Sequence, residues 1–144
     1  MSKETSFSIK VIPFNQYERE IKYIRQSVFI DECKIPASLE WDDQDTSARF
    51  AIAQSRSKCI GVGRLLNDGH IGRVTVLKEY RQQGVGTGII QALIKTAAKQ
   101  GHESVFLTSQ EGAILFYETL GFTPSGDRFE AAGIPHQLMT MRLA

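Results

Sequence analysis

The chain has 144 residues, 42% of them hydrophobic, which suits a single domain over residues 1–144. Its formal net charge of +1 gives no reason to expect broad attraction to nucleic acid or to a membrane surface. No apolar run comes near the roughly 18 residues of a transmembrane helix, and the N-terminus lacks the apolar segment of a secretory signal.

The two cysteines, Cys33 and Cys59, lie far apart in the chain and show no metal-ligand spacing. They are too few for a disulfide framework and are typical of a chain kept in a reducing compartment. No potential base has a recognisable relation to Cys33, so a nucleophilic role for its thiol is disfavoured. We therefore expect a cytoplasmic protein without a bound metal.

The N-terminal segment predicts one strand and one helix. Apolar residues alternate over Phe7–Ile12, which indicates a half-buried strand. Asn15 and Glu18 have the N-x-x-E spacing of a capping box, which predicts the start of a helix. The apolar face of this helix consists of Ile21, Ile24 and Val28.

Three further strands are expected before the middle of the chain. The first two cover Arg49–Ala53 and Cys59–Leu66, with a hairpin turn at Gln54–Lys58. Asn67–Gly69 is the clearest turn signal of the chain and leads into the third strand, Ile71–Leu77. Strands joined by such short turns predict an antiparallel meander.

The most informative segment is the run Arg81–Ile89, RQQGVGTGI, between this third strand and a helical pattern over Ile89–Lys99. A glycine-rich turn at a helix start directs several N–H groups and the positive end of the helix dipole to one place. The glycines also remove Cβ atoms that would keep a pyrophosphate at a distance. The segment therefore favours a phosphate-bearing ligand, with an ordinary glycine-rich loop as the alternative.

The spacing argues against two common phosphate sites. A P-loop needs a lysine after its last glycine, and none follows here. A dinucleotide fold needs G-x-G-x-x-G and an acid at the end of the next strand. The spacing here is G-x-G-x-G, and Glu103 precedes the next strand.

The C-terminal half predicts one more helix and three strands. Ser104–Thr108 follows a crossover helix, so we expect it to lie parallel to Ile71–Leu77. A helix follows over Glu111–Leu120, and two antiparallel strands lie around 128–130 and 137–143. The apolar positions of that helix are Ile114, Phe116, Tyr117 and Leu120, and its Schellman end is Gly121 with Phe122. The predicted class is α+β, an α/β/α sandwich with a mixed sheet and helices on both faces.

Two motifs resemble the GNAT superfamily of N-acyltransferases. Arg81, Gly84 and Gly86 match its signature Arg/Gln-x-x-Gly-x-Gly/Ala at a strand-to-helix turn. The segment 113–122, AILFYETLGF, is similar to the family's helix that ends in fYe-x-lGF. Gln82 replaces a common glycine, but its amide can still donate. The resemblance implies a mostly antiparallel sheet with a central splayed parallel pair, and acetyl-CoA as the acetyl donor, with no metal.

The resemblance also implies where acetyl-CoA binds. Backbone N–H groups of the turn would hold the pyrophosphate, and the pantetheine arm would pair as an added strand alongside Arg73–Val76. A backbone N–H near Val74 would polarise the thioester carbonyl. The expected donor-side residues are Val74, Thr75, Val76, Arg81, Gln82, Gln83, Gly84, Val85, Gly86 and Thr87.

Tyr117 is the residue that the resemblance places near the sulfur during direct attack by an amine. A reference phenol titrates near 10 and a thiol near 8.5, so full proton transfer from Tyr117 to the thiolate would be uphill by roughly 2 kcal/mol. We therefore expect Tyr117 to stabilise the leaving thiolate by a hydrogen bond. A core aromatic residue on a helix face is the alternative.

The acceptor side is less specific. The acidic segment Asp31–Thr46 is similar to the acceptor side of small bacterial GNAT proteins, and autoinducer synthases carry a comparable arrangement of an arginine with acids. The expected substrate-binding residues are Arg25, Trp41, Asp42 and Asp45. An amine must lose a proton to react, and Glu40 and His136 are the expected bases. A solvated acidic loop, and a histidine bonded only to backbone, are the alternatives.

The expected activity is N-acetyl transfer to a small-molecule or peptide amine. Two alternatives are a catalytically silent acyl-CoA-binding module and an acyltransferase like the autoinducer synthases. By analogy with GNAT sheets that pair through their C-terminal strands, a homodimer is a further expectation.

Overall fold

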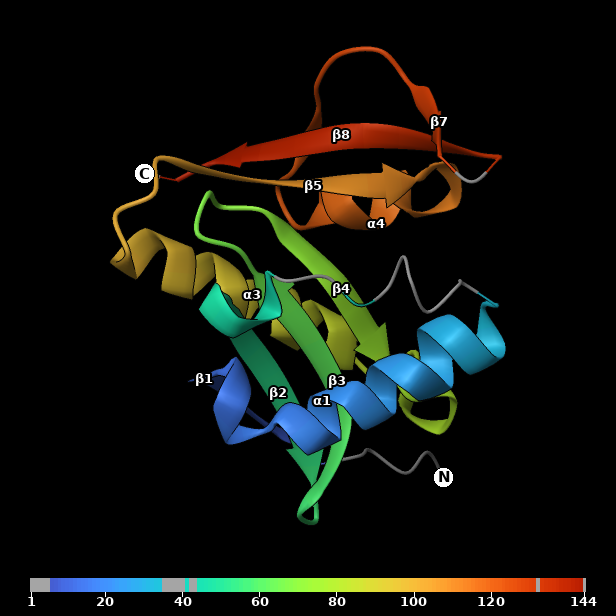
Figure 1. Cartoon of the computed structure of the whole chain (residues 1–144). Coiled ribbons are helices and arrows are strands. Elements are labelled where there is room, and N and C mark those ends of the chain that lie inside the picture. The colour runs from blue at the N-terminus through green and yellow to red at the C-terminus, as the bar shows by residue number, and fades with distance from the viewer. Residues whose placement is uncertain (1–5, 35–40, 42–43, 132, 144) are drawn as a thin grey trace.

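The computed structural model describes residues 6–34, 41, 44–131 and 133–143 (Figure 1). Its strands form two four-stranded sheets. In the first sheet, neighbouring strands are antiparallel in the order β1 (Ser8–Pro13), β2 (Arg49–Ser55), β3 (Lys58–Leu65) and β4 (Ile71–Val76). In the second, β8 (Ile134–Arg142) pairs antiparallel with β5 (Ser104–Gln110), β6 (Thr123–Pro124) and β7 (Phe129–Ala131).

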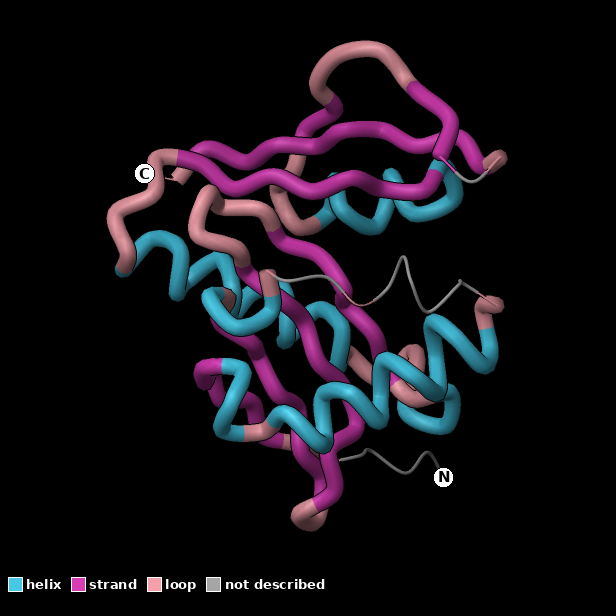
Figure 2. The backbone as a smooth tube through the Cα atoms, in the orientation of Figure 1, coloured by secondary structure: helices cyan, strands magenta, loops and turns pink. Residues whose placement is uncertain are grey.

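Helices cover both faces of the first sheet. Helix α1 (Glu18–Arg25) continues into a π-helical segment, η2 (Gln26–Glu32), and lies on the opposite face from α3 (Val85–Lys99) (Figure 2). Helix α4 (Ile114–Thr119) lies against the second sheet. Four single 3₁₀ turns complete the chain: η1 (Phe14–Gln16), η3 (Asp45–Ser47), η4 (Lys78–Tyr80) and η5 (Glu111–Ala113). No described helix combines the length and apolar character that crossing a membrane requires. The predicted α+β class is confirmed.

The helix faces were predicted better than the helix start. Ile21 and Ile24 are fully buried and Val28 is nearly so, as the spacing indicated. The capping box is wrong, because Asn15 lies inside η1 and the N-cap of α1 is Tyr17, without a side-chain cap bond. The β2–β3 turn is also tighter than expected. Arg56 and Ser57 both have positive φ, 50° and 69°, as a two-residue type I′ turn requires.

Two glycines of β3 let α3 approach the sheet closely. A Cβ on Gly61 would lie 2.9 Å from the Ile89 Cδ1 atom, and one on Gly63 would lie 2.5 Å from Ile89 Cγ2. Ile89 and Leu93 are fully buried in the core on this face. The amphipathic pattern of α3 therefore packs against a strand whose side chains have been removed where the helix crosses it.

Strands β4 and β5 run parallel where they meet and then separate. Their one described bridge joins His70 to Phe106, and the Phe106 N–H donates to the Gly69 carbonyl at 3.1 Å. The His70 ring, which looked solvated from the sequence, stacks on Phe106 with centroids 4.9 Å apart. Burial lowers the pKa of His70. The splayed parallel pair is confirmed, with its closed end at His70.

The C-terminal part matches in type and differs in detail. The Schellman end of α4 is confirmed, because Phe122 N–H donates to the Tyr117 carbonyl and Gly121 N–H donates to that of Glu118, both at 3.1 Å. Phe116, expected on the apolar face, is 40% exposed. It cannot join the core because α4 has fewer than two turns and buries another side.

Candidate active site

A cavity of about 350 Å³ lies where β4 and β5 separate. Arg73 and Val74 of β4 line it, opposite residues 107–110 of β5. Phe29 of η2, Tyr117 of α4 and His136 of β8 complete the part of the lining that the argument uses. We call this space the β4–β5 cavity. It brings together two predicted catalytic residues, Tyr117 and His136, that lie far apart in the chain.

A β-bulge shapes the β4 side of this cavity. Gly72 pairs with Arg64 and Thr75 pairs with Val62, so Arg73 and Val74 together face the single residue Gly63. Arg73 has a φ of +50°, a left-handed conformation that side chains other than glycine rarely adopt. Bulges occur often beside active sites, where they redirect a side chain. No sequence signal marked this bulge, because Arg73 is not one of the residue types that favour positive φ.

Tyr117 lies in an apolar environment. Its ring contacts Phe116 and Phe122 edge to face, with centroids 5.1 and 6.0 Å away. Burial raises the pKa of the Tyr117 phenol above its usual value of 10. A phenol with a raised pKa stays protonated and remains a hydrogen-bond donor, but it is a weaker acid. The environment therefore suits hydrogen bonding to a leaving thiolate better than proton transfer.

His136 bonds to backbone and also lines the cavity. Its Nδ1 lies 2.7 Å from the Ile134 carbonyl oxygen, which assigns the proton of the neutral ring to Nδ1. In that tautomer Nε2 is a proton acceptor. The ring also stacks on Phe129 with centroids 5.8 Å apart. The backbone bond expected of a structural histidine is thus the contact that orients a potential base.

A second cavity of about 380 Å³ lies at the glycine turn and is called here the turn cavity. Its lining includes Val76, Phe116 and the predicted turn residues Arg81, Gln82, Gly84, Val85, Gly86 and Thr87. Gln83 is exposed and its side chain donates to the Glu79 carbonyl. Thr75 is buried, although the residues on either side of it, Val74 and Val76, line the two cavities.

The glycines of the turn serve different purposes. Gly84 is the N-cap of α3 with φ of +85°, and a Cβ there would meet no atom within 4 Å, so its backbone conformation is what requires glycine. A Cβ on Gly86 would meet only Val76 Cγ2, at 3.9 Å. On Gly88 it would lie 2.6 Å from Ile9 Cδ1, so that glycine allows close packing on β1.

Arg81 uses its side chain within the protein. Its Nε donates to the Val76 carbonyl at 2.9 Å, and its two terminal nitrogens donate to both oxygens of Glu32 at 2.8 and 2.9 Å. The Arg81 guanidinium lowers the pKa of the Glu32 carboxyl. The pair connects the turn to the end of η2. Sequence reasoning missed Glu32, because its partner lies far along the chain.

Three residues expected on the acceptor side form a separate buried group. One Asp45 oxygen accepts from Arg25 and from Arg64, each at 2.9 Å, and all three side chains are at least nine-tenths buried. The Trp41 ring lies over the Arg25 guanidinium, 4.9 Å from its centroid. Trp41 and Asp45 line a different hollow, beside α1. Contrary to what the sequence suggested for these residues, their observed contacts are with one another.

Glu40 and Asp42, the remaining acceptor-side residues of the sequence analysis, lie outside the described residues. Of the acceptor-side residues predicted and described, His136 is the one that lines the β4–β5 cavity.

Comparison with known proteins agrees with this architecture. The model of the acetyltransferase (GNAT) domain family matches residues 17–143. The chain is 37% identical over 123 residues to BSU40680 of Bacillus subtilis (81% of this chain, 84% of that protein), and 36% over 121 residues to the uncharacterized N-acetyltransferase YjcF of the same organism (81% and 86%). A crystal structure from Lactobacillus plantarum, named as a candidate N-acetyltransferase, superposes with a TM-score of 0.88 at 26% identity, covering 96% of this chain and 99% of that one. The chain belongs to the GNAT acetyltransferase family.

Proposed function

We propose that the protein transfers an acetyl group from acetyl-CoA to an amine of a small molecule or peptide by direct attack in a ternary complex. The arrangement of the two cavities carries this proposal. Strand β4 lines the β4–β5 cavity with Val74 and the turn cavity with Val76, while α4 lines them with Tyr117 and Phe116. An extended donor with phosphates at one end and a reactive group at the other would follow β4 between the two cavities.

The residues of the turn fit a pyrophosphate. Helix α3 has no side-chain cap bond at Gly84 and no acid in its first turn. Its first N–H groups therefore offer donors that the helix itself does not satisfy, reinforced by the helix dipole. Where β4 separates from β5, the edge of β4 lacks a neighbouring strand and suits pairing with an extended amide chain.

The side chains of the β4–β5 cavity would handle the protons. Acetyl-CoA supplies an activated thioester, whose carbonyl carbon forms a bond to the amine nitrogen as its bond to sulfur breaks. His136 Nε2 would accept the proton that the amine loses. Tyr117 would donate a hydrogen bond to the departing sulfur, which later takes up a proton, so charge does not accumulate on an unsolvated thiolate.

Release of free thiol from acetyl-CoA tests the proposal. The protein is incubated with acetyl-CoA and, in turn, with polyamines, amino acids, aminoglycosides, peptide N-termini and S-adenosylmethionine. Amine-dependent thiol release together with acetylated product would support the proposal. Measurable CoA binding without thiol release from any acceptor would favour the silent module. Release with S-adenosylmethionine alone would favour the autoinducer-synthase type of reaction.

A further inference from the structure

We propose that the acceptor carries an anionic group, a carboxylate or a phosphate, close to its amine, and that Arg73 binds that group in the β4–β5 cavity. This inference rests on the proposed acetyl transfer and specifies its substrate class. It reverses the cationic acceptor that the acidic segment of the sequence suggested.

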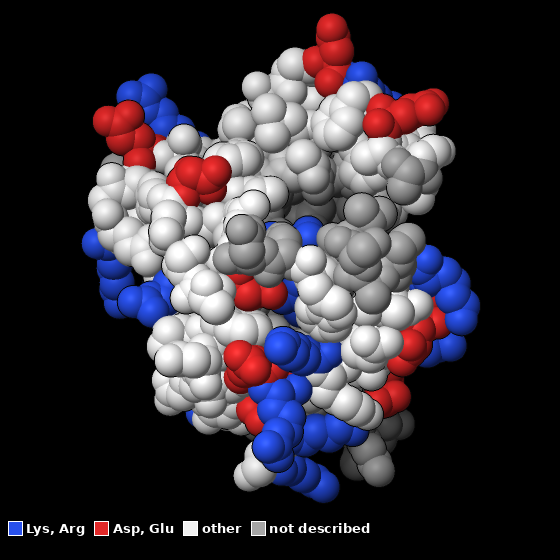
Figure 3. All heavy atoms as spheres, viewed as in Figure 1, with Lys and Arg blue, Asp and Glu red and all other residues white. Residues whose placement is uncertain are grey.

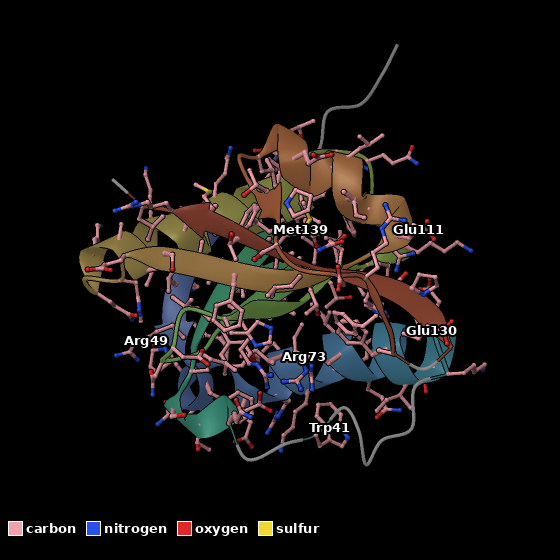
Figure 4. The ribbon with its side chains drawn as sticks, turned by 90° about the horizontal axis from the view of Figure 1, so that it is seen from above. Trp41, Arg49, Arg73, Glu111, Glu130 and Met139 are labelled. Atoms are coloured by element: carbon pink, nitrogen blue, oxygen red, sulfur yellow. The ribbon has the colours of Figure 1, made fainter. Side chains whose placement is uncertain are left out.

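The charges that line the cavity support an anionic ligand. Arg73 is the one Lys or Arg among the described lining residues, and that lining contains no Asp or Glu. Figure 3 shows a small basic surface inside the hollow near the centre of this face, and Figure 4 shows Arg73 near the middle of the molecule, in contrast to Arg49 toward its edge. A guanidinium has five N–H donors in a planar fork, so it can bind an anion while keeping contacts to the protein.

The bulge explains how an arginine reaches this cavity. Side chains of β4 alternate between the two faces of the sheet, and Ile71 faces the core beneath α3. Without the extra residue, alternation would send Arg73 into that core and Val74 to the opposite face. With it, Val74 packs in the core, its Cγ2 3.3 Å from the Cβ position of Gly63, and Arg73 lines the cavity. A strained backbone at a functional position is a known association, of the order of 1–3 kcal/mol per residue.

The size and the neighbours of the cavity limit the acceptor further. Its volume of about 350 Å³ is near the lower end for small-molecule sites. The acetyl end of the donor would occupy part of it. Tyr117 and His136 line the same space as Arg73, so an anion held at Arg73 leaves the amine within a few bonds of the reacting groups. The class that fits is a small primary amine with its anion a few atoms from nitrogen.

Matched acceptor pairs test the inference by thiol release. The pairs are β-alanine with β-alaninamide and phosphoethanolamine with ethanolamine, with putrescine as the dication. We expect kcat/KM at least tenfold higher for the anionic member of one pair, and the pair that shows it identifies carboxylate or phosphate. In Arg73→Gln that preference should disappear, Arg73→Lys should keep part of it, and the exposed control Arg49→Gln should keep all of it.

The outcomes separate this inference from the function on which it rests. Thiol release that favours the neutral amines or putrescine would overturn the anionic acceptor while leaving acetyl transfer standing. No thiol release from any amine would count against acetyl transfer, and binding then decides the inference. With CoA present, β-alanine or phosphoethanolamine should raise the melting temperature of the wild type but not of folded Arg73→Gln. Equal shifts in both proteins, or none in the wild type, would overturn it.

Discussion

The two halves of the site are built from different materials. The turn that faces the donor consists of consecutive residues, and it offers backbone N–H groups at the start of α3. The β4–β5 cavity takes its chemistry from side chains on separate elements, with Arg73 on β4, Tyr117 on α4 and His136 on β8. Backbone donors need only the right local conformation, whereas converging side chains need the whole fold. The donor half is therefore a property of a segment and the acceptor half a property of the tertiary structure.

The largest expected effect concerns an acid that belongs to neither half. Asp45→Asn removes the charge that two buried arginines share, so we expect the free energy of unfolding to fall by about 3–5 kcal/mol. Urea denaturation measures it, with the exposed Asp127→Asn as the control. If stability is kept and only the acceptor KM rises, Asp45 belongs to the acceptor half after all.

Tyr117 is expected where the two halves meet. Tyr117→Phe removes a hydrogen-bond donor to the leaving sulfur, so kcat should fall by about 10²-fold while the Kd for CoA changes little. Steady-state thiol release and calorimetric CoA titration give the two numbers. Tyr23→Phe, at a residue 65% exposed, is the matched control. A Tyr117→Phe enzyme with unchanged turnover would remove this residue from the reaction.

A pair of glycine variants tests whether the donor half acts through its backbone. Gly84→Ala forces an alanine to a φ of +85°, so stability should fall by about 1–2 kcal/mol and CoA affinity with it. Gly86→Ala meets only ordinary contact with Val76 and should keep the stability. If Gly86 leaves space for a pyrophosphate, its alanine variant loses roughly tenfold in CoA affinity, about 1.4 kcal/mol. Unchanged CoA binding in both variants would move the donor away from the turn.

The smallest effect is a pH dependence of stability. Burial raises the pKa of folded Tyr117 above its unfolded value, so the folded state holds this proton more tightly. Its contribution to stability is complete below pH 10 and is lost as the pH rises through the folded pKa. The melting temperature of the wild type should therefore fall more steeply between pH 9 and 11 than that of Tyr117→Phe. Parallel curves would contradict the buried phenol.

Local patterns predicted the elements well wherever one segment carried the whole signal. The alternation in β1, the periodicity of α3 and the Gly121–Phe122 end of α4 all depend on residues a few positions apart. The capping box at Asn15 failed because η1 occupies the backbone that would have made the cap. The expected acceptor role of Asp45 did not foresee that Arg25 and Arg64, from two other elements, would converge on it.

The sequence by itself determined the family, the α+β class and the glycine turn at the start of α3, because each depends on short-range spacing that the chain carries in consecutive residues. The tertiary structure decided which charges the acceptor meets. It buried Asp45 between two arginines, brought His136 to the same cavity as Tyr117, and placed Arg73 there through a bulge in β4. Electrostatic character depends on distances between side chains, and only packing sets those distances.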